Sequence, residues 1–384
     1  MNKNEKKIAI FTYWSSSDNY GQLLQAFALQ TVLKQMGMKP FFVNYKPSFI
    51  ADLKTKKKSV FKIFDLARVQ NFLGNKISKL FYSKMFRREF DSFRHNYISL
   101  SKEQYRTLTD LKSSPPDADY YICGSDQIWK NTGSLEKLEV YLLNIPTNAV
   151  KIAYAASFGK KYEELDEGTV KIFTENLPKF KAVSVREKSG VEACVKLGYS
   201  NAVWLPDPTL LLTKIDYENF FKINNTPSIW KTNKKRILIY TVDNKANVFK
   251  SEAVKYIKKQ KEYEVVHISS QRDNSGDFFP TIEGWIRCMQ QADFILTNSF
   301  HGTVFSVIFN KEFAVLPSEG KHIGMNERVF SLLEKTNQSH KVLYEIKRIK
   351  ELLLDKSDWS FVENKLAIWR EEAKSFLKNH IKSE

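Results

Sequence analysis

The sequence has 384 residues, of which 42% are hydrophobic and 27% are charged, as is ordinary for a globular protein of two or three domains. Glycine and proline are scarce, which excludes collagen-like and largely disordered chains. No apolar run is long enough to span a membrane, and the first residues do not form a secretory signal, so we expect a cytoplasmic protein. Three widely separated cysteines predict buried, reduced thiols; they are Cys123, Cys194 and Cys288.

Positive charge is concentrated in one part of the sequence. The net charge is +17, and residues 51–95 alone hold twelve Lys and Arg against four acidic residues, with seven phenylalanines threaded among them. The interpretation that we prefer is a pair of solvated helices whose Phe faces pack on the domain. Peripheral contact with an anionic membrane is the alternative, and the absence of any nucleic-acid motif argues against a nucleic-acid partner.

Short apolar runs alternate with longer amphipathic segments up to residue 223. The run 8–13 predicts a buried strand, and 23–36 predicts a helix that ends at Gly37. A second helix is expected over 187–197, ending at Gly198. Further strands are expected over 40–43, 120–123, 152–155, 182–185 and 203–205.

The polar stretch 224–235 predicts a linker, after which the alternation restarts. Strands are expected over 236–240, 264–268, 294–297 and 313–316, with helices over 282–291 and 301–309 between them. Two strand–helix series predict an α/β fold of two doubly wound domains with mainly parallel sheets. We expect the domains to span 1–223, with the basic insert 51–95, and 236–361. For 362–384 we expect a helix, and packing back on the first domain is one option.

Ligands of open α/β sheets bind where the strands end and turn toward helices, so candidate residues are those that directly follow each apolar run. The strongest candidate is Asn298-Ser299-Phe300-His301-Gly302. Its backbone amides would lie in the first turn of a helix and bind an anion, and a histidine there could exchange a proton with that anion. The alternative is an N-cap serine beside a histidine that only packs.

Arginines and aspartates are the next candidates. Arg186 directly follows a predicted strand and presents a guanidinium that suits phosphate or carboxylate; a surface ion pair is the alternative. Asp126 and Asp207 also follow strands and could orient a sugar hydroxyl or the histidine, or act as turn residues. Arg328, near a helix start, could point a second guanidinium inward.

Several common catalytic motifs are missing from the sequence. It contains no Gly-x-Gly-x-x-Gly after a strand, no P-loop, no His-Glu-x-x-His and no nucleophile elbow. The residue set therefore favours anion binding with acid–base chemistry over hydride transfer, NTP hydrolysis or acyl-enzyme chemistry. We expect no metal centre and no cofactor.

Five motifs follow one another along the chain. They are Asn19-Tyr20-Gly21, Gly124-Ser125-Asp126-Gln127-Ile128-Trp129, Ser184-Val185-Arg186-Glu187, Pro206-Asp207-Pro208-Thr209-Leu210-Leu211 and Ser299-Phe300-His301-Gly302. In this order and spacing they resemble the polysaccharide pyruvyltransferase family, and the resemblance covers about residues 8–335.

The resemblance implies two Rossmann-like halves in a GT-B-like arrangement, with the site in the cleft between them. The first half would be on the acceptor side and the second on the donor side. Members transfer a pyruvyl group from phosphoenolpyruvate to a sugar of a bacterial surface glycan, usually as a cyclic ketal. The implied partners are phosphoenolpyruvate, as co-substrate, and a lipid-diphosphate-linked oligosaccharide. By similarity, His301 would be the acid–base residue and Arg186 would hold the phosphate or carboxylate of the donor.

One motif departs from the family, because many members carry Arg-Leu-His where this chain has Ser299-Phe300-His301. Arg328 or Lys321 is the candidate to replace the missing guanidinium, and a different donor is the alternative. We expect His301 and Asp126 to be catalytic. Substrate contacts are expected from Asn19, Gly21, Gly124, Ser125, Arg186, Asp207, Asn298, Ser299, Gly302, Lys321 and Arg328. The rival functions are a GT-B-type glycosyltransferase that uses a nucleotide sugar and a non-catalytic anion or glycan binder.

Overall fold

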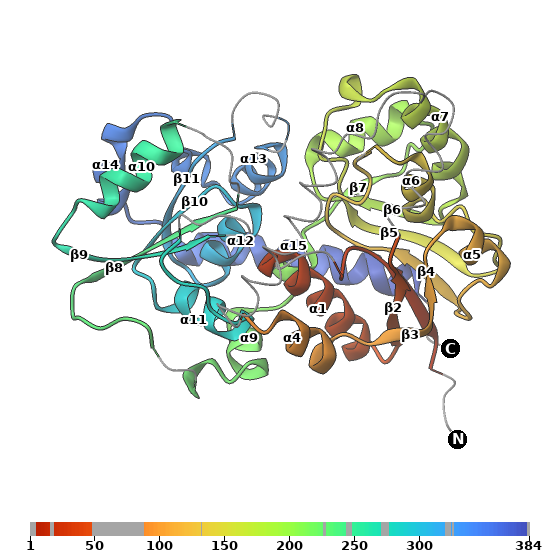
Figure 1. The fold of residues 1–384 in the computed structure, drawn as a ribbon. Coiled ribbons are helices and arrows are strands. Elements are labelled where there is room, and N and C mark those ends of the chain that lie inside the picture. Colours follow the sequence, from red (N-terminus) through yellow and green to blue (C-terminus); the bar gives the residue numbers. More distant parts are fainter. Residues whose placement is uncertain are drawn as a thin grey trace, which may run out of the picture.

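The computed structural model describes residues 5–15, 19–47, 88–131, 133–225, 228–242, 248–269, 276–318, 324 and 326–381. Within these ranges the chain forms two parallel β-sheets side by side, flanked by helices (Figure 1). The expected α/β class with two doubly wound halves is therefore confirmed. Residues 51–87 of the basic segment and Lys321 lie outside the described residues.

The first sheet contains seven strands in the described part of the chain. They are β1 (Lys7–Phe11), β2 (Lys39–Tyr45), β3 (Leu100–Tyr105), β4 (Tyr120–Cys123), β5 (Val150–Ala156), β6 (Ala182–Val185) and β7 (Val203–Trp204). Their order is β3-β2-β1-β4-β5-β6-β7, and every pair is parallel. The order reverses between β1 and β4, which is the switch point where α/β proteins bind their ligands.

The second sheet contains four parallel strands among the described residues. They are β8 (Lys235–Thr241), β9 (Tyr263–Ser269), β10 (Phe294–Thr297) and β11 (Glu312–Val315), in the order β11-β10-β8-β9. The switch point of this sheet lies between β8 and β10. The residues toward the carboxyl ends of both strands are apolar and buried. This is expected of parallel strands, because helices cover both faces of a parallel sheet.

Helix α1 (Tyr20–Gln35) is buried along almost its whole length, because it packs between the first sheet and the second half of the chain (Figure 1). Helix α4 (Phe90–Tyr97) begins within the basic segment 51–95, and its Phe90 and Phe93 are buried in the core, as the packing interpretation predicts for these two residues. The other helices of this half are α5 (Leu108–Ser113), α6 (Leu135–Tyr141), α7 (Glu167–Asn176), α8 (Lys188–Lys196) and α9 (Lys214–Phe220).

An aromatic cluster joins the two halves. Tyr20 of α1 stacks on Trp285 of α11 (Ile282–Gln291) with ring centroids 5.3 Å apart, and the Tyr20 hydroxyl donates to the carbonyl of Pro280 at 2.6 Å. Trp285 in turn packs edge-on against Tyr240 and against Phe305 of α12 (Phe300–Ile308). Because this cluster belongs to one continuous core, the amino-terminal end of α1 is held facing α12.

The C-terminal helix connects the second half back to the first (Figure 1). The remaining helices are α10 (Val248–Lys258), α13 (Asn326–Lys335), α14 (Ile349–Leu354) and α15 (Trp359–His380). In α15 the indole of Trp369 donates to the carbonyl of Trp204, and Nε of Arg370 donates to the carbonyl of Leu210 at 2.7 Å. No helix within the described ranges combines the length and apolar character needed to cross a bilayer.

Candidate active site

A cavity of about 170 Å³ lies where the switch points of the two sheets face each other. The first half contributes residues that follow β4 and precede α1, and the second half contributes residues that follow β8, β10 and β11 and the start of α13. Six of the expected site residues line this cavity: Asn19, Asp126, Asn298, Ser299, His301 and Arg328. The structure therefore places at one cavity residues that are far apart in the sequence.

Two helices begin at the cavity. Asn19 caps α1 by accepting the amide of Gln22 at 3.2 Å, and Ser299 caps α12 by accepting the amide of Gly302 at 3.2 Å. The first-turn amides of a helix carry a partial positive charge, so the two helix starts together favour an anionic ligand. The side chain of Asn298 accepts the amide of Val242 at 2.9 Å and so joins the ends of β8 and β10 beneath α12.

His301 lies in the first turn of α12 and packs directly against Gly21 of α1. A methyl group built on Gly21 would lie 2.1 Å from Cγ and from Nδ1 of the imidazole, so only glycine leaves room for this ring. Gly302 has a similar role, because a methyl group there would lie 2.2 Å from Oγ1 of Thr297. Neither glycine has a side chain to offer a substrate; both allow α12 to approach its neighbours closely.

We expect Gly21→Ala to disturb catalysis by pushing the His301 ring out of place. The overpacking should lower stability by about 1–3 kcal/mol, and turnover should fall further than stability alone explains, because the imidazole is displaced. Urea unfolding and turnover of the purified variant measure the two effects. Gly168→Ala is the matched control, since its added methyl meets no atom closer than 3.4 Å. Unchanged turnover in Gly21→Ala would show that the contact is absent from the working enzyme.

Behind the cavity lies a buried cluster centred on Asp207, which is 1% exposed. Its Oδ2 accepts Nη1 of Arg186 at 2.7 Å and the hydroxyl of Ser125 at 2.8 Å. Its Oδ1 accepts both the amide and the hydroxyl of Thr209, at 3.0 and 2.6 Å. These bonds fix the ends of β4 and β6 and the turn after β7 to one another, and they place a carboxylate directly beneath α12.

Asp207 also faces the histidine. Nε2 of His301 lies 3.6 Å from Oδ2 of Asp207, and this nitrogen is buried without a hydrogen-bond partner. Burial alone would raise the pKa of Asp207, but the imidazole of His301 and the guanidinium of Arg186 outweigh burial and hold that pKa far below its ordinary value. Asp207 is therefore ionised at neutral pH, and its carboxylate can orient the histidine.

Asp126 lines the cavity from the first half of the chain and has a strained backbone, with φ at 88°. Its Oδ2 accepts Nε2 of Gln22 at 3.0 Å, and its Oδ1 lies 3.7 Å from Nη2 of Arg186. Burial would raise the pKa of Asp126, but the charges of Arg186 and His301 dominate and lower it. An ionised carboxylate at this position can accept a proton from a hydroxyl group.

The ring of Phe300 contacts two guanidinium groups. The guanidinium carbon of Arg186 lies 4.5 Å from the ring centroid of Phe300, and that of Arg328 lies 5.5 Å from it. Aromatic rings stabilise cations placed over their faces, so the ring helps to hold two like charges near each other. Sequence reasoning did not select Phe300, although it lies inside the motif that contains His301, and it did not select Gln22.

The remaining expected residues do not line the cavity. Ser125, Arg186 and Asp207 form the buried cluster, and Gly124 packs against the side chain of Thr12. We therefore describe these residues as positioning groups in the present arrangement. Among the residues that the structure describes, no three His, Cys, Asp or Glu side chains are grouped as a metal ion would require.

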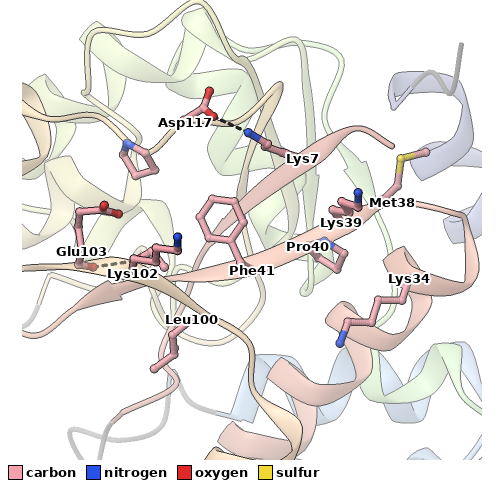
Figure 2. Close-up of a pocket in the computed structure, with 12 residues that line it drawn as sticks. Lys7, Lys34, Met38, Lys39, Pro40, Phe41, Leu100, Lys102, Glu103 and Asp117 are labelled. Carbon is pink, nitrogen blue, oxygen red and sulfur yellow. Dashed lines mark hydrogen bonds and ion pairs between the residues drawn. The ribbon is translucent and has the colours of Figure 1, made fainter. Parts of the chain in front are cut away.

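A wider hollow of about 580 Å³ lies at the opposite, amino-terminal end of the first sheet (Figure 2). It is lined by several lysines, including Lys7 and Lys39, but these two are paired with Asp117 and Glu5. None of its lining residues has a buried polar atom without a partner. We therefore assign the site to the smaller cavity, where unsatisfied buried groups and the switch points coincide.

Comparison with known families identifies the chain. It belongs to the polysaccharide pyruvyl transferase family, whose model matches residues 19–320. The resemblance noted from the five motifs is therefore confirmed, and family membership indicates a transferase. A search of curated proteins found no significant match.

Solved structures with the same architecture are remote in sequence. MnaA of S. aureus, determined with UDP, has 13% identity and a TM-score of 0.50, covering 98% of this chain and 96% of its own. A candidate UDP-N-acetylglucosamine 2-epimerase of Listeria monocytogenes has 10% identity and a TM-score of 0.50, covering 98% and 97%. UGT89C1 of Arabidopsis thaliana, complexed with UDP-L-rhamnose, has 11% identity and a TM-score of 0.46, covering 98% and 96%. At such identities the likeness concerns the fold alone, and the first two structures confirm the expected GT-B-like arrangement.

Proposed function

We propose that the protein transfers the pyruvyl group of phosphoenolpyruvate to a sugar of a bacterial surface glycan or of its lipid-linked precursor, forming a cyclic ketal and releasing phosphate. The observation that carries this proposal is the placement of His301. It lies in the first turn of α12, between the cavity and the buried carboxylate of Asp207. This placement combines an anion-binding helix start with a proton-exchanging group, and family membership supports the transferase class.

The proposed reaction needs one proton donor and one proton acceptor. A proton is added to the methylene carbon of phosphoenolpyruvate while a sugar hydroxyl attacks the adjacent carbon and loses its own proton. The bond from this carbon to the phosphate oxygen then breaks and phosphate leaves. A second sugar hydroxyl adds to the same carbon to close the ketal, and its proton is taken up by the departing phosphate. We assign delivery of the first proton to His301 and acceptance of the hydroxyl proton to Asp126, because both line the cavity, one from each half of the chain.

We also propose that each half of the chain binds one substrate. The second half would bind the donor, because the α12 start and Arg328 concentrate positive charge there. The first half would bind the acceptor sugar, through Asn19 and Asp126 on its side of the cavity. A lipid-diphosphate-linked acceptor would be reached at the cytoplasmic membrane face, where the net positive charge of the chain favours an anionic surface.

Thermal stabilisation by ligands tests the donor assignment. A ligand that binds only the folded protein stabilises it by about 2.7 kcal/mol at a hundred times its Kd. We expect phosphoenolpyruvate to raise the melting temperature and UDP to leave it unchanged. Stabilisation by UDP with none by phosphoenolpyruvate would contradict the proposal and favour a glycosyltransferase.

A further inference from the structure

We propose that Arg328, and not Arg186, binds the phosphate group of the donor. This inference rests on the proposed function and specifies the group that holds the donor in the cavity. Three observations support it: the position of each guanidinium relative to the cavity, the presence or absence of an anionic partner for each guanidinium, and the groups that surround Arg328.

Arg328 reaches the cavity from the first turns of α13. The residue is 7% exposed and lines the cavity together with Ser299 and Phe300 of the α12 start. Its Nε is buried without a hydrogen-bond partner, and no carboxylate of the described residues lies within 4 Å of the guanidinium. A buried cation is stable only when a counter-charge and hydrogen bonds compensate for its lost hydration, so this position calls for an anionic ligand.

Arg186 differs from Arg328 in its place relative to the cavity and in its ion pairing, while its Nε and Nη2 are likewise buried without a hydrogen-bond partner. Its side chain is 1% exposed and does not line the cavity. Its charge is already balanced by Asp207, whose carboxylate lies 2.7 Å away, and Ser125 accepts a further hydrogen bond from it. Arg186 is therefore a positioning residue that fixes Asp207, and through Asp207 it fixes the environment of His301.

The surroundings of Arg328 favour a phosphate over a carboxylate. Among the described residues that line the cavity, Arg328 is the one permanently charged cation, and it lies beside the amides of the α12 start. A dianionic phosphate gains most from a guanidinium fork and a helix start acting together.

Binding of inorganic phosphate and of phosphoenolpyruvate to Arg328→Met tests the inference by calorimetric titration. We expect both dissociation constants to rise roughly 10- to 100-fold, because a charge-assisted bidentate contact is lost. Pyruvate, which has no phosphate, should bind the variant and the unmodified protein equally. Arg328→Lys keeps the charge but loses the fork, so its phosphate affinity should lie between the two.

Thermal stability without ligand separates a ligand-binding role from a structural one. Arg328→Met should melt at the same temperature as the unmodified protein or above it, because the substitution removes an uncompensated buried charge. Arg370→Met is the matched control. Arg370 is equally buried but is paired with Glu363 and the carbonyl of Leu210, so its loss should lower the melting temperature and leave phosphate affinity unchanged.

The outcomes distinguish this inference from the proposed function. The inference would be overturned if Arg328→Met bound phosphate and phosphoenolpyruvate as tightly as the unmodified protein does. It would also be overturned if Arg328→Met kept its phosphate affinity but melted at a lower temperature, as Arg370→Met is expected to do. Either result would leave the proposed reaction standing. Phosphate binding that depends on Arg328, in a protein that does not bind phosphoenolpyruvate, would support Arg328 as the phosphate ligand and overturn phosphoenolpyruvate as the donor.

Discussion

Replacing His301 by alanine is expected to lower turnover with phosphoenolpyruvate by roughly two orders of magnitude or more, because general acid–base groups contribute about that much. The imidazole is the one histidine side chain lining the cavity among the described residues, and Asp207 lies 3.6 Å from its Nε2. No other side chain named at the cavity offers an equivalent proton donor. Initial rates of phosphate release at saturating donor measure the effect.

The fold of His301→Ala should be retained, since α12 is fixed by its cap and by the apolar face that it buries. The melting temperature should therefore change far less than turnover does. His95→Ala is the control, because His95 is exposed on α4, away from the cavity, and its loss should leave turnover unchanged. Near-normal turnover in a well-folded His301→Ala protein would exclude the proton-transfer role.

Replacing Asp207 by asparagine is expected to destabilise the protein by about 3–5 kcal/mol at neutral pH and to abolish most of the activity. The substitution leaves the guanidinium of Arg186 buried without its carboxylate partner and removes the charge that faces His301. Chemical denaturation measures the stability change. Asp117→Asn is the control, because that carboxylate is 89% exposed and its loss should cost less than about 0.5 kcal/mol.

The stability difference between the unmodified protein and Asp207→Asn should depend on pH. The pKa of Asp207 is lower in the folded chain than its unfolded value of about 3.9, so the folded state favours the ionised carboxylate. This contribution is fully present above about pH 4 and is lost as the pH falls toward the folded pKa. The urea midpoint of the unmodified protein should therefore lie far above that of Asp207→Asn at pH 7, and the difference between the two midpoints should be smaller at pH 3. A gap that widens on acidification would contradict the assignment.

Most of the fold could be predicted from the sequence, because parallel strands buried on both faces appear as short apolar runs. The helix expected over 282–291 agrees with α11 in its bounds. Strand β3 was not predicted. Its residues Ser101 to Gln104 are polar and largely exposed at the edge of the first sheet, so no apolar pattern marks them.

The sequence also predicts candidate residues at the ends of β4 and β10, and the structure shows that both strand ends supply residues to the cavity. The different surroundings of the two arginines could not be predicted from the sequence. Arg186 and Arg328 have the same chemistry, and only the fold shows that Asp207 compensates for one of them and that no carboxylate of the described chain is paired with the other. The contact of Gly21 with His301 joins residues 280 positions apart, which no local pattern reveals. Lys321 lies outside the described residues.

The most direct test of the proposed reaction is a product analysis. The purified protein would be incubated with phosphoenolpyruvate and a panel of galactose-, glucose- and mannosamine-containing lipid-linked acceptors, with phosphate release and product mass followed together. We predict an acceptor product heavier by one pyruvyl ketal, formed with one phosphate released per product and lost in His301→Ala. The account would be contradicted if no acceptor gave that product and if the protein were stabilised by a nucleoside diphosphate but not by phosphoenolpyruvate.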